Sequence, residues 1–163
     1  MIAGVDIGGT KIAAGMIDDE GHVRSRFESA TSADLGYSKA LERTTKMLRD
    51  ASASAHAEIT GIGIGSTGPV DPFSGEIGEV NFFPAWKGEN PVKDLERIFH
   101  VSVAIENDAD AAALGEASWG ANRAGSPVLF NDESRDVPEP ETIFMVPVAY
   151  WSDGSAAPDM AVH

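Results

Sequence analysis

The strongest constraint on the fold lies at the start of the chain, where two short apolar segments flank a pair of glycines. Residues 2–7 and 12–17 are rich in isoleucine and other small apolar residues, and Gly8 and Gly9 separate them. Short apolar segments bounded by glycine predict buried strands joined by a tight turn. A polar turn at residues 18–21 and an alternating segment at residues 22–28 then predict the returning strand of a hairpin.

The middle of the chain alternates between helical and strand-like patterns. Residues 34–54 repeat apolar side chains at helical spacing, which predicts an amphipathic helix. Residues 59–65 alternate isoleucine with glycine, which indicates a strand with one face open to close approach of another backbone. We expect residues 66–90 to form a long polar loop. The residues on the apolar face of the helix are Leu35, Ala40, Leu41, Thr44, Met47, Leu48 and Ala51.

Two polar residues, Asn107 and Asp108, fall on a predicted strand-to-helix junction. Pro91 begins a short predicted helix, residues 101–106 form a predicted strand, and residues 109–119 are strongly helix-forming. Ligands of α/β folds gather at the carboxyl ends of strands, so this junction is a candidate site. The order of elements predicts an α/β fold with a mixed sheet flanked by helices.

Composition excludes several classes of function. The formal net charge of −14 repels phosphate backbones and anionic lipid surfaces, so we expect neither nucleic acid nor a membrane as partner. The absence of cysteine rules out disulfides and thiolate zinc sites, and the four histidines lie too far apart in sequence to suggest a metal helix. The first residues lack the pattern of a signal peptide, so a cytoplasmic location is expected.

The amino-acid composition of the sequence changes near Gly125. Prolines and acidic residues accumulate from there on, and only residues 143–151 keep a strand-like apolar character, interrupted by Pro147. We therefore divide the chain into a lobe at residues 1–124 and an atypical acidic, proline-rich tail at residues 125–163. One interpretation is a truncated or frameshifted gene, and the alternative is a natural tail that adds an edge strand.

The segment from Asp6 to Lys11 has the composition of a phosphate-binding turn. Glycines at positions 8 and 9 let backbone amides approach phosphate oxygens, which a Cβ atom would hinder. Thr10 offers a hydroxyl, Lys11 offers a positive charge, and the carboxylate of Asp6 is suited to magnesium held through water. The alternative is a hairpin turn that simply requires glycine.

Three segments, in this order, resemble motifs of the ROK family (repressors, open reading frames and kinases) of the actin-like ATPase superfamily. Residues 6–11 are similar to its first phosphate loop, residues 61–71 to its glycine-rich sugar-side loop, and residues 106–116 to the segment with its catalytic aspartate. About the first 124 residues fit this pattern. The resemblance implies a ribonuclease H-like lobe and ATP-dependent phosphorylation of a glucose-like hexose, with Mg²⁺.

The same resemblance implies roles for individual residues. Asp108 corresponds to the general base that accepts a proton from the attacking sugar hydroxyl, and Asn107 to an asparagine that hydrogen-bonds a neighbouring hydroxyl. A helix cap is the competing role for both residues. Backbone groups at Gly68 and Pro69 are further expected sugar contacts, with a weaker expectation for Asp71.

The chain departs from the family pattern before Trp86. The family often has an asparagine four positions earlier, where this chain has Phe82, and Asn81 is the nearest candidate for its role. The second lobe of the family, with its adenosine pocket and zinc cluster, has no recognisable counterpart here. A homodimer is an expectation only for the full-length family form.

Two other functions remain open at this stage. A non-catalytic sugar-binding module would explain the missing second lobe. A sugar-sensing ROK regulator is the other, but those regulators carry a basic helix-turn-helix ahead of the phosphate loop, which begins here at Asp6.

Overall fold

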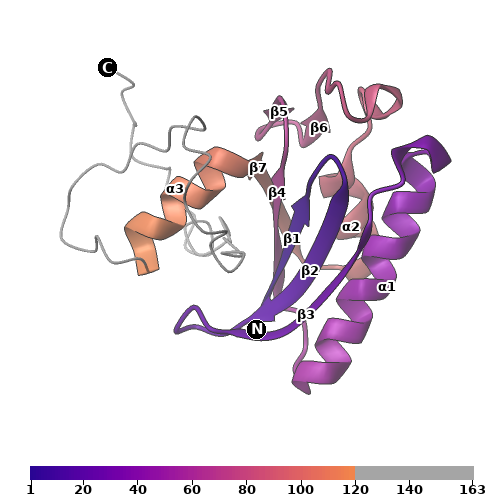
Figure 1. Cartoon of the computed structure of the whole chain (residues 1–163). Coiled ribbons are helices and arrows are strands. Elements are labelled where there is room, and N and C mark those ends of the chain that lie inside the picture. Colours follow the sequence, from indigo (N-terminus) through magenta and orange to yellow (C-terminus); the bar gives the residue numbers. More distant parts are fainter. Residues whose placement is uncertain (120–163) are drawn as a thin grey trace.

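Five strands form one mixed sheet in the order β3-β2-β1-β4-β7 (Figure 1). The computed structural model describes residues 1–119. Strands β1 (Ile2–Ile7), β2 (Lys11–Ile17) and β3 (Val23–Ala30) pair antiparallel, as predicted for the opening hairpins. Strands β4 (Gly61–Ser66) and β7 (Ser102–Asn107) continue the sheet parallel to β1. Because β1, β4 and β7 are parallel, their carboxyl ends meet at one edge of the sheet.

The two faces of the sheet differ in the size of their side chains. Val5 pairs in register with Ala14 and Ile64, and these buried side chains form the core under α1 and α2. Asp6 pairs with Ala13 and Gly65, so this row points to the opposite face, where α3 lies (Figure 1). Helices therefore flank the sheet on both faces, which confirms the predicted architecture.

The predicted helix at residues 34–54 is divided in two. A short 3-10 helix, η1 (Ala33–Leu35), is followed by α1 (Tyr37–Ala55), and Gly36 separates them with a φ of 83°. That positive φ, which glycine adopts readily, separates the two helices, and Leu35 is left 59% exposed. The prediction that Leu35 belongs to the apolar face of the helix was therefore wrong. The remaining residues of that face, from Ala40 to Ala51, are buried or half-buried against the sheet.

The segment at residues 66–90, predicted as a polar loop, contains regular structure and part of the core. It forms a two-stranded hairpin, β5 (Val70–Asp71) with β6 (Glu76–Ile77), and a 3-10 helix, η2 (Pro84–Trp86). Its buried apolar residues recur at every third position, which is neither the 3.6-residue period of an α-helix nor the two-residue period of a strand, yet they are buried through long-range packing. The buried side chains are Ile77, Val80, Phe83 and Trp86.

The last two helices begin close to their predicted positions. Helix α2 (Pro91–Phe99) has proline in its first turn, and its N-cap residue, Asn90, accepts a hydrogen bond from the Lys93 amide at 2.9 Å. Helix α3 (Asp108–Trp119) follows β7 directly. None of the described helices is long and apolar enough to cross a bilayer. The predicted strand at residues 143–151 lies outside the described residues.

Candidate functional site

The strands place the predicted site residues at one edge of the sheet. Asp6 lies near the end of β1, Gly68 follows β4, and Asp108 follows β7. The amide of Thr67 donates to the carbonyl oxygen of Ile7 at 3.0 Å, which holds the loop after β4 against the end of β1. We call this group the carboxyl-end site and define it by Asp6, Gly8, Gly9, Gly68 and Asp108.

The carboxyl-end site contains two acidic side chains, and the charge of one acts on the other. Burial raises the pKa of Asp6 above its usual value of 3.8, and the negative charge of Asp108 raises it further. Lys11 and Arg26 oppose the shift without reversing it. Gly65, which pairs with Asp6, lies next to the start of α3, because a Cβ built on it would be 3.9 Å from the Cα of Asp108. Asp6 and Asp108, predicted from separate motifs, therefore lie together.

The glycine turn, residues 8–11, joins β1 to β2 and leaves backbone donors available. The amide of Gly8 donates to the carbonyl oxygen of Lys11 at 2.9 Å and closes the turn. The amides of Gly9 and Thr10 make no hydrogen bond with any other residue among those described. A Cβ atom on Gly8 would lie 3.0 Å from the Lys11 carbonyl oxygen, so a side chain there would crowd the turn. The turn is thus both a hairpin turn and a potential anion site.

A buried threonine that the sequence analysis missed holds the glycine turn in place. The Thr31 hydroxyl donates to the carbonyl oxygen of Gly8 at 2.7 Å, and its amide donates to the carbonyl oxygen of Thr10 at 2.9 Å. The Arg43 guanidinium in turn donates to the Thr31 carbonyl oxygen. Thr31 follows β3 without any motif around it, so only the fold identifies it.

The side chain of Lys11 lies beside the strand that returns from the hairpin. Its ammonium forms an ion pair with Glu28 at 3.4 Å, and both side chains are about half exposed. The positive charge of Lys11 also acts on Asp6, where it partly offsets the rise in the pKa of that carboxyl group. An exposed pair of this kind is weak and easily exchanged, so Lys11 can turn toward an anion at a small energetic cost.

Asn107 connects two parts of the carboxyl-end site. Its side-chain amide donates to the carbonyl oxygen of Gly68 at 3.0 Å, and its Oδ1 accepts from the amide of Ala109 at 3.0 Å. Asp108 Oδ1 accepts from the same amide at 2.9 Å. Both residues therefore cap α3, the competing role considered from the sequence, while Asp108 remains exposed at the helix start.

The loop after β4 depends on close packing at Gly68. Gly68 has a φ of 81°, and a Cβ atom there would lie 2.7 Å from Cγ2 of Val80. Pro69 and Asn81, the other predicted sugar contacts, are exposed on the same loop region. Asp71 instead builds the β5–β6 turn, because its Oδ1 accepts from the amides of Phe73 at 2.9 Å and Ser74 at 3.3 Å.

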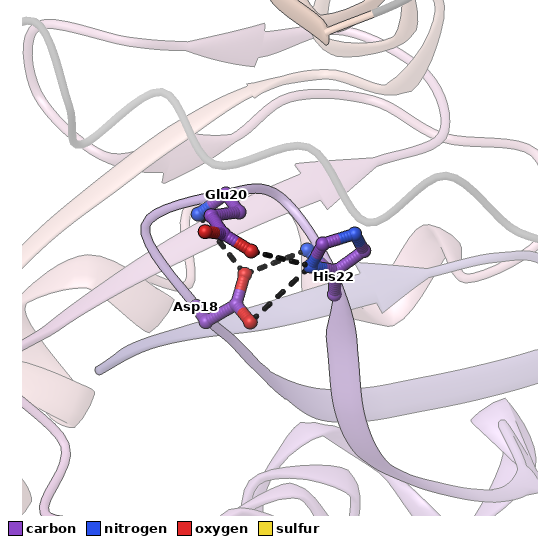
Figure 2. A group of neighbouring side chains, drawn as sticks. All are labelled: Asp18, Glu20 and His22. Atoms are coloured by element: carbon purple, nitrogen blue, oxygen red, sulfur yellow. Dashed lines mark hydrogen bonds and ion pairs between the residues drawn. The ribbon is translucent and has the colours of Figure 1, made fainter.

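A second cluster of ionisable side chains lies away from this edge, in the β2–β3 turn. Figure 2 shows Asp18, Glu20 and His22 facing one another, close enough for their ligand atoms to surround a cation. However, Asp18 Oδ1 already accepts from the amides of Glu20 and His22, and its Oδ2 accepts from Arg24 Nε at 2.6 Å. These bonds, led by that of the His22 amide, lower the pKa of Asp18 to about 2. The described contacts are those of a turn-forming aspartate.

Comparisons with known proteins match this architecture. The ROK family model covers residues 2–131. A glucokinase from Streptomyces coelicolor is 36% identical over 134 residues, which cover 77% of this chain and 38% of the relative. The chain thus spans well under half the length of that relative.

Solved structures agree with the sequence relatives. A ROK hexokinase from Thermus thermophilus superposes with a TM-score of 0.66 at 31% identity, covering 74% of this chain and 40% of the other. A ROK family glucokinase from Streptomyces griseus, solved with glucose and AMPPNP, gives a TM-score of 0.64 at 35% identity, covering 74% and 37%. The fold is therefore that of an actin-like ATPase lobe, and the chain belongs to the ROK family.

Proposed function

We propose that this chain supplies the acceptor side and the first phosphate turn of an ATP-dependent hexose kinase. The observation that carries the proposal is the approach of Asp108 to Asp6 at the edge where the glycine turn also lies. Family membership supports it, since relatives of this chain include glucokinases. Glucose or a related hexose is the proposed acceptor.

Asp108 is the proposed general base. It is exposed at the start of α3, where a sugar hydroxyl can reach its carboxylate. As the hydroxyl oxygen bonds to the γ-phosphorus of ATP, its proton passes to Asp108 and the bond from that phosphorus to the bridging oxygen of ADP breaks. Holding the nucleophile in line is the main requirement of such a transfer, and one aligned carboxylate meets it.

The glycine turn is the proposed contact for the phosphates of ATP. The amides of Gly9 and Thr10 are available as donors, Thr10 adds its hydroxyl, and Lys11 adds a positive charge. Thr31 donates hydrogen bonds to the carbonyl oxygens of Gly8 and Thr10. The amides of the glycine turn are therefore held in place before a ligand arrives. The turn therefore fits an anion.

The carboxylates fit a hard divalent cation. Asp6 has a raised pKa because it is buried and close to another acid, and a cation near both groups would stabilise their ionised forms. We propose that Asp6 holds Mg²⁺ through water. When bound, Mg²⁺ would neutralise charge that develops on the transferred phosphoryl group.

The proposed sugar contacts lie on the loop that follows β4 and on the junction after β7. Asn107 is already tied to Gly68 and Ala109, so it offers its second amide hydrogen while it fixes the loop. Pro69, which follows Gly68, and Asn81, which follows Val80, are both exposed. We propose that Gly68, Pro69, Asn81 and Asn107 position the hexose next to Asp108.

The proposed lobe comprises residues 1–124, and the family match includes all but its first residue and continues to residue 131. Because the chain spans 38% of a full-length glucokinase, a second function deserves a test: sugar binding without phosphoryl transfer. Closure between two lobes normally excludes water from a phosphoryl donor, and this chain carries the residues of one such lobe.

One experiment separates the two functions. The purified chain is incubated with Mg²⁺, ATP and glucose, and both hexose phosphate and the melting temperature are measured. Glucose-dependent product that is lost in Asp108→Asn supports the kinase, while stabilisation by glucose without product supports the binding module. Neither product nor stabilisation by any hexose would contradict both.

A further inference from the structure

An exposed phenylalanine lies directly on the glycine turn. Phe82 is 63% exposed, yet a Cβ atom built on Gly9 would lie 2.6 Å from its Cγ and 2.9 Å from its Cδ1. The ring therefore occupies the space on the Cβ side of Gly9, while most of its surface faces water. The ring thus presents apolar surface next to the candidate site, and ligand pockets are lined largely by apolar and aromatic side chains.

The neighbours of Phe82 hold it in this position. Val80 is buried against Gly68, and Phe83 is buried and stacks on Trp86 with ring centroids 4.5 Å apart. The amide of Phe83 donates to the carbonyl oxygen of Val80 at 3.2 Å. The segment between these anchors spans from the loop after β4 to the turn after β1, which are neighbouring strands.

Phe82 lies between the glycine turn and the loop that carries the proposed hexose contacts. It touches the glycine turn on one side, and through Val80 its segment touches Gly68, the residue to which Asn107 donates. Asn107 directly precedes Asp108. A hexose that contacts both Asp108 and the loop at Gly68 would lie beside this ring.

We propose that Phe82 determines sugar specificity by packing its ring against a C–H face of the pyranose. This inference rests on the proposed function, since it assumes that a hexose binds at the carboxyl-end site. A phenyl ring offers apolar surface and no hydrogen-bond partner. It therefore favours a sugar face that carries C–H groups and disfavours one that carries a hydroxyl.

The stereochemistry of hexoses turns this preference into a selection. In glucose the hydroxyls at C2, C3 and C4 are equatorial, so both ring faces present axial C–H groups. The axial hydroxyls of mannose at C2 and of galactose at C4 lie on one face, and that of allose at C3 lies on the other. Whichever face packs on Phe82, glucose is preferred over at least one of these epimers.

The test measures dissociation constants for glucose, mannose, galactose and allose from sugar-dependent shifts in melting temperature. Phe82→Ala should weaken glucose binding about tenfold, the value for removing a contact of about 1.4 kcal/mol, and should reduce the preference over epimers. Phe82→Tyr keeps the ring and should retain both. Phe73→Ala is the matched control, because Phe73 is 95% exposed at the tip of the β5–β6 hairpin.

The outcomes distinguish the inference from the proposed function. If the unmodified chain binds glucose and Phe82→Ala has the same affinities and the same epimer ratios, the role of Phe82 is overturned and the hexose site stands. If no hexose stabilises the unmodified chain, the hexose site and the role of Phe82 fail together. Phe82 is largely exposed, so the melting temperature without sugar should change little in Phe82→Ala and confirm that the variant folds.

Discussion

The charge of Asp108 acts on the carboxyl group of Asp6 across the edge of the sheet, although 101 residues separate the two in the chain. Burial is the main cause of the raised pKa of Asp6, and the charge of Asp108 is the second. A carboxyl whose pKa is higher in the folded state than in the unfolded state stabilises the fold at low pH. That contribution is lost as the pH rises through the folded pKa.

Replacing Asp6 by asparagine should therefore stabilise the chain at neutral pH. Asp6→Asn removes the cost of ionising a half-buried carboxyl, and the melting temperature at pH 7 should rise by a few degrees. The gain should vanish near pH 3, where Asp6 is protonated. Asp34→Asn, at an exposed aspartate of η1, is the control and should show no such pH-dependent gain. A decrease in stability at pH 7 would show that Asp6 is instead stabilised in its charged form.

The packing at Gly68 predicts that alanine there lowers the free energy of unfolding by more than the strain of the positive φ alone would. Gly68→Ala introduces a left-handed alanine, at about 1–2 kcal/mol, and a clash with Val80 that adds about 1–3 kcal/mol. Gly88 has a φ of 82°, and no atom lies within 4 Å of a Cβ built on it. Gly88→Ala should therefore lose only the energy of the backbone strain, without a clash. Urea unfolding of both variants gives the difference. Equal losses would contradict the packing of Val80 on Gly68.

The Thr31 hydroxyl should contribute to stability and to nucleotide affinity together. Thr31→Val keeps the shape of the side chain but removes the bond to Gly8, with an expected loss of about 1–3 kcal/mol in the free energy of unfolding. Thr31→Ser keeps the hydroxyl and should retain nucleotide binding better than Thr31→Val. Stabilisation by Mg²⁺ with ATP is the measurement. Equal binding by the two variants would show that the hydroxyl does not organise the glycine turn.

The β2–β3 turn should weaken in acid. The pKa of Asp18 is lowered from 3.8 to about 2, so its stabilising contribution is present above about pH 4 and is lost as the pH falls toward 2. Asp18→Asn keeps an oxygen acceptor for the amides of Glu20 and His22 but cannot ionise. Between pH 4 and pH 2, the melting temperature of the unmodified chain should fall more steeply than that of Asp18→Asn. Parallel curves would contradict the assignment.

Local patterns predicted most of the sheet and the positions of the candidate site residues within it. The glycine pair, the isoleucine–glycine alternation and the Asn107–Asp108 junction each lie in a short segment with its own period or punctuation, and each took its predicted place. The small shifts, such as the strand predicted at residues 59–65 and found at Gly61–Ser66, are errors at element ends. Helical spacing also predicted the buried face of α1.

Long-range packing decided what the patterns missed. The buried apolar residues of the segment at residues 66–90 recur at every third position, which is neither a helical nor a strand period, and Trp86 is buried where it packs against Tyr37 of α1 and Phe83. Likewise, Thr31 acquires its role when β3 returns beside the glycine turn. Gly36 had a local signal, since glycine ends helices, but it was outweighed by the helical spacing around it.

Transfer of labelled phosphate from ATP to glucose tests the central claim most directly, because a radioactive label reveals even slow turnover. The assay compares the unmodified chain with Asp108→Asn, and glucose-dependent stabilisation confirms that the variant still binds sugar. We predict glucose-dependent labelled product from the unmodified chain and a rate lower by about 10²–10⁴-fold in Asp108→Asn. Equal rates in the two proteins, or no glucose-dependent product from the unmodified chain, would contradict the assignment of Asp108 as the base of a hexose kinase.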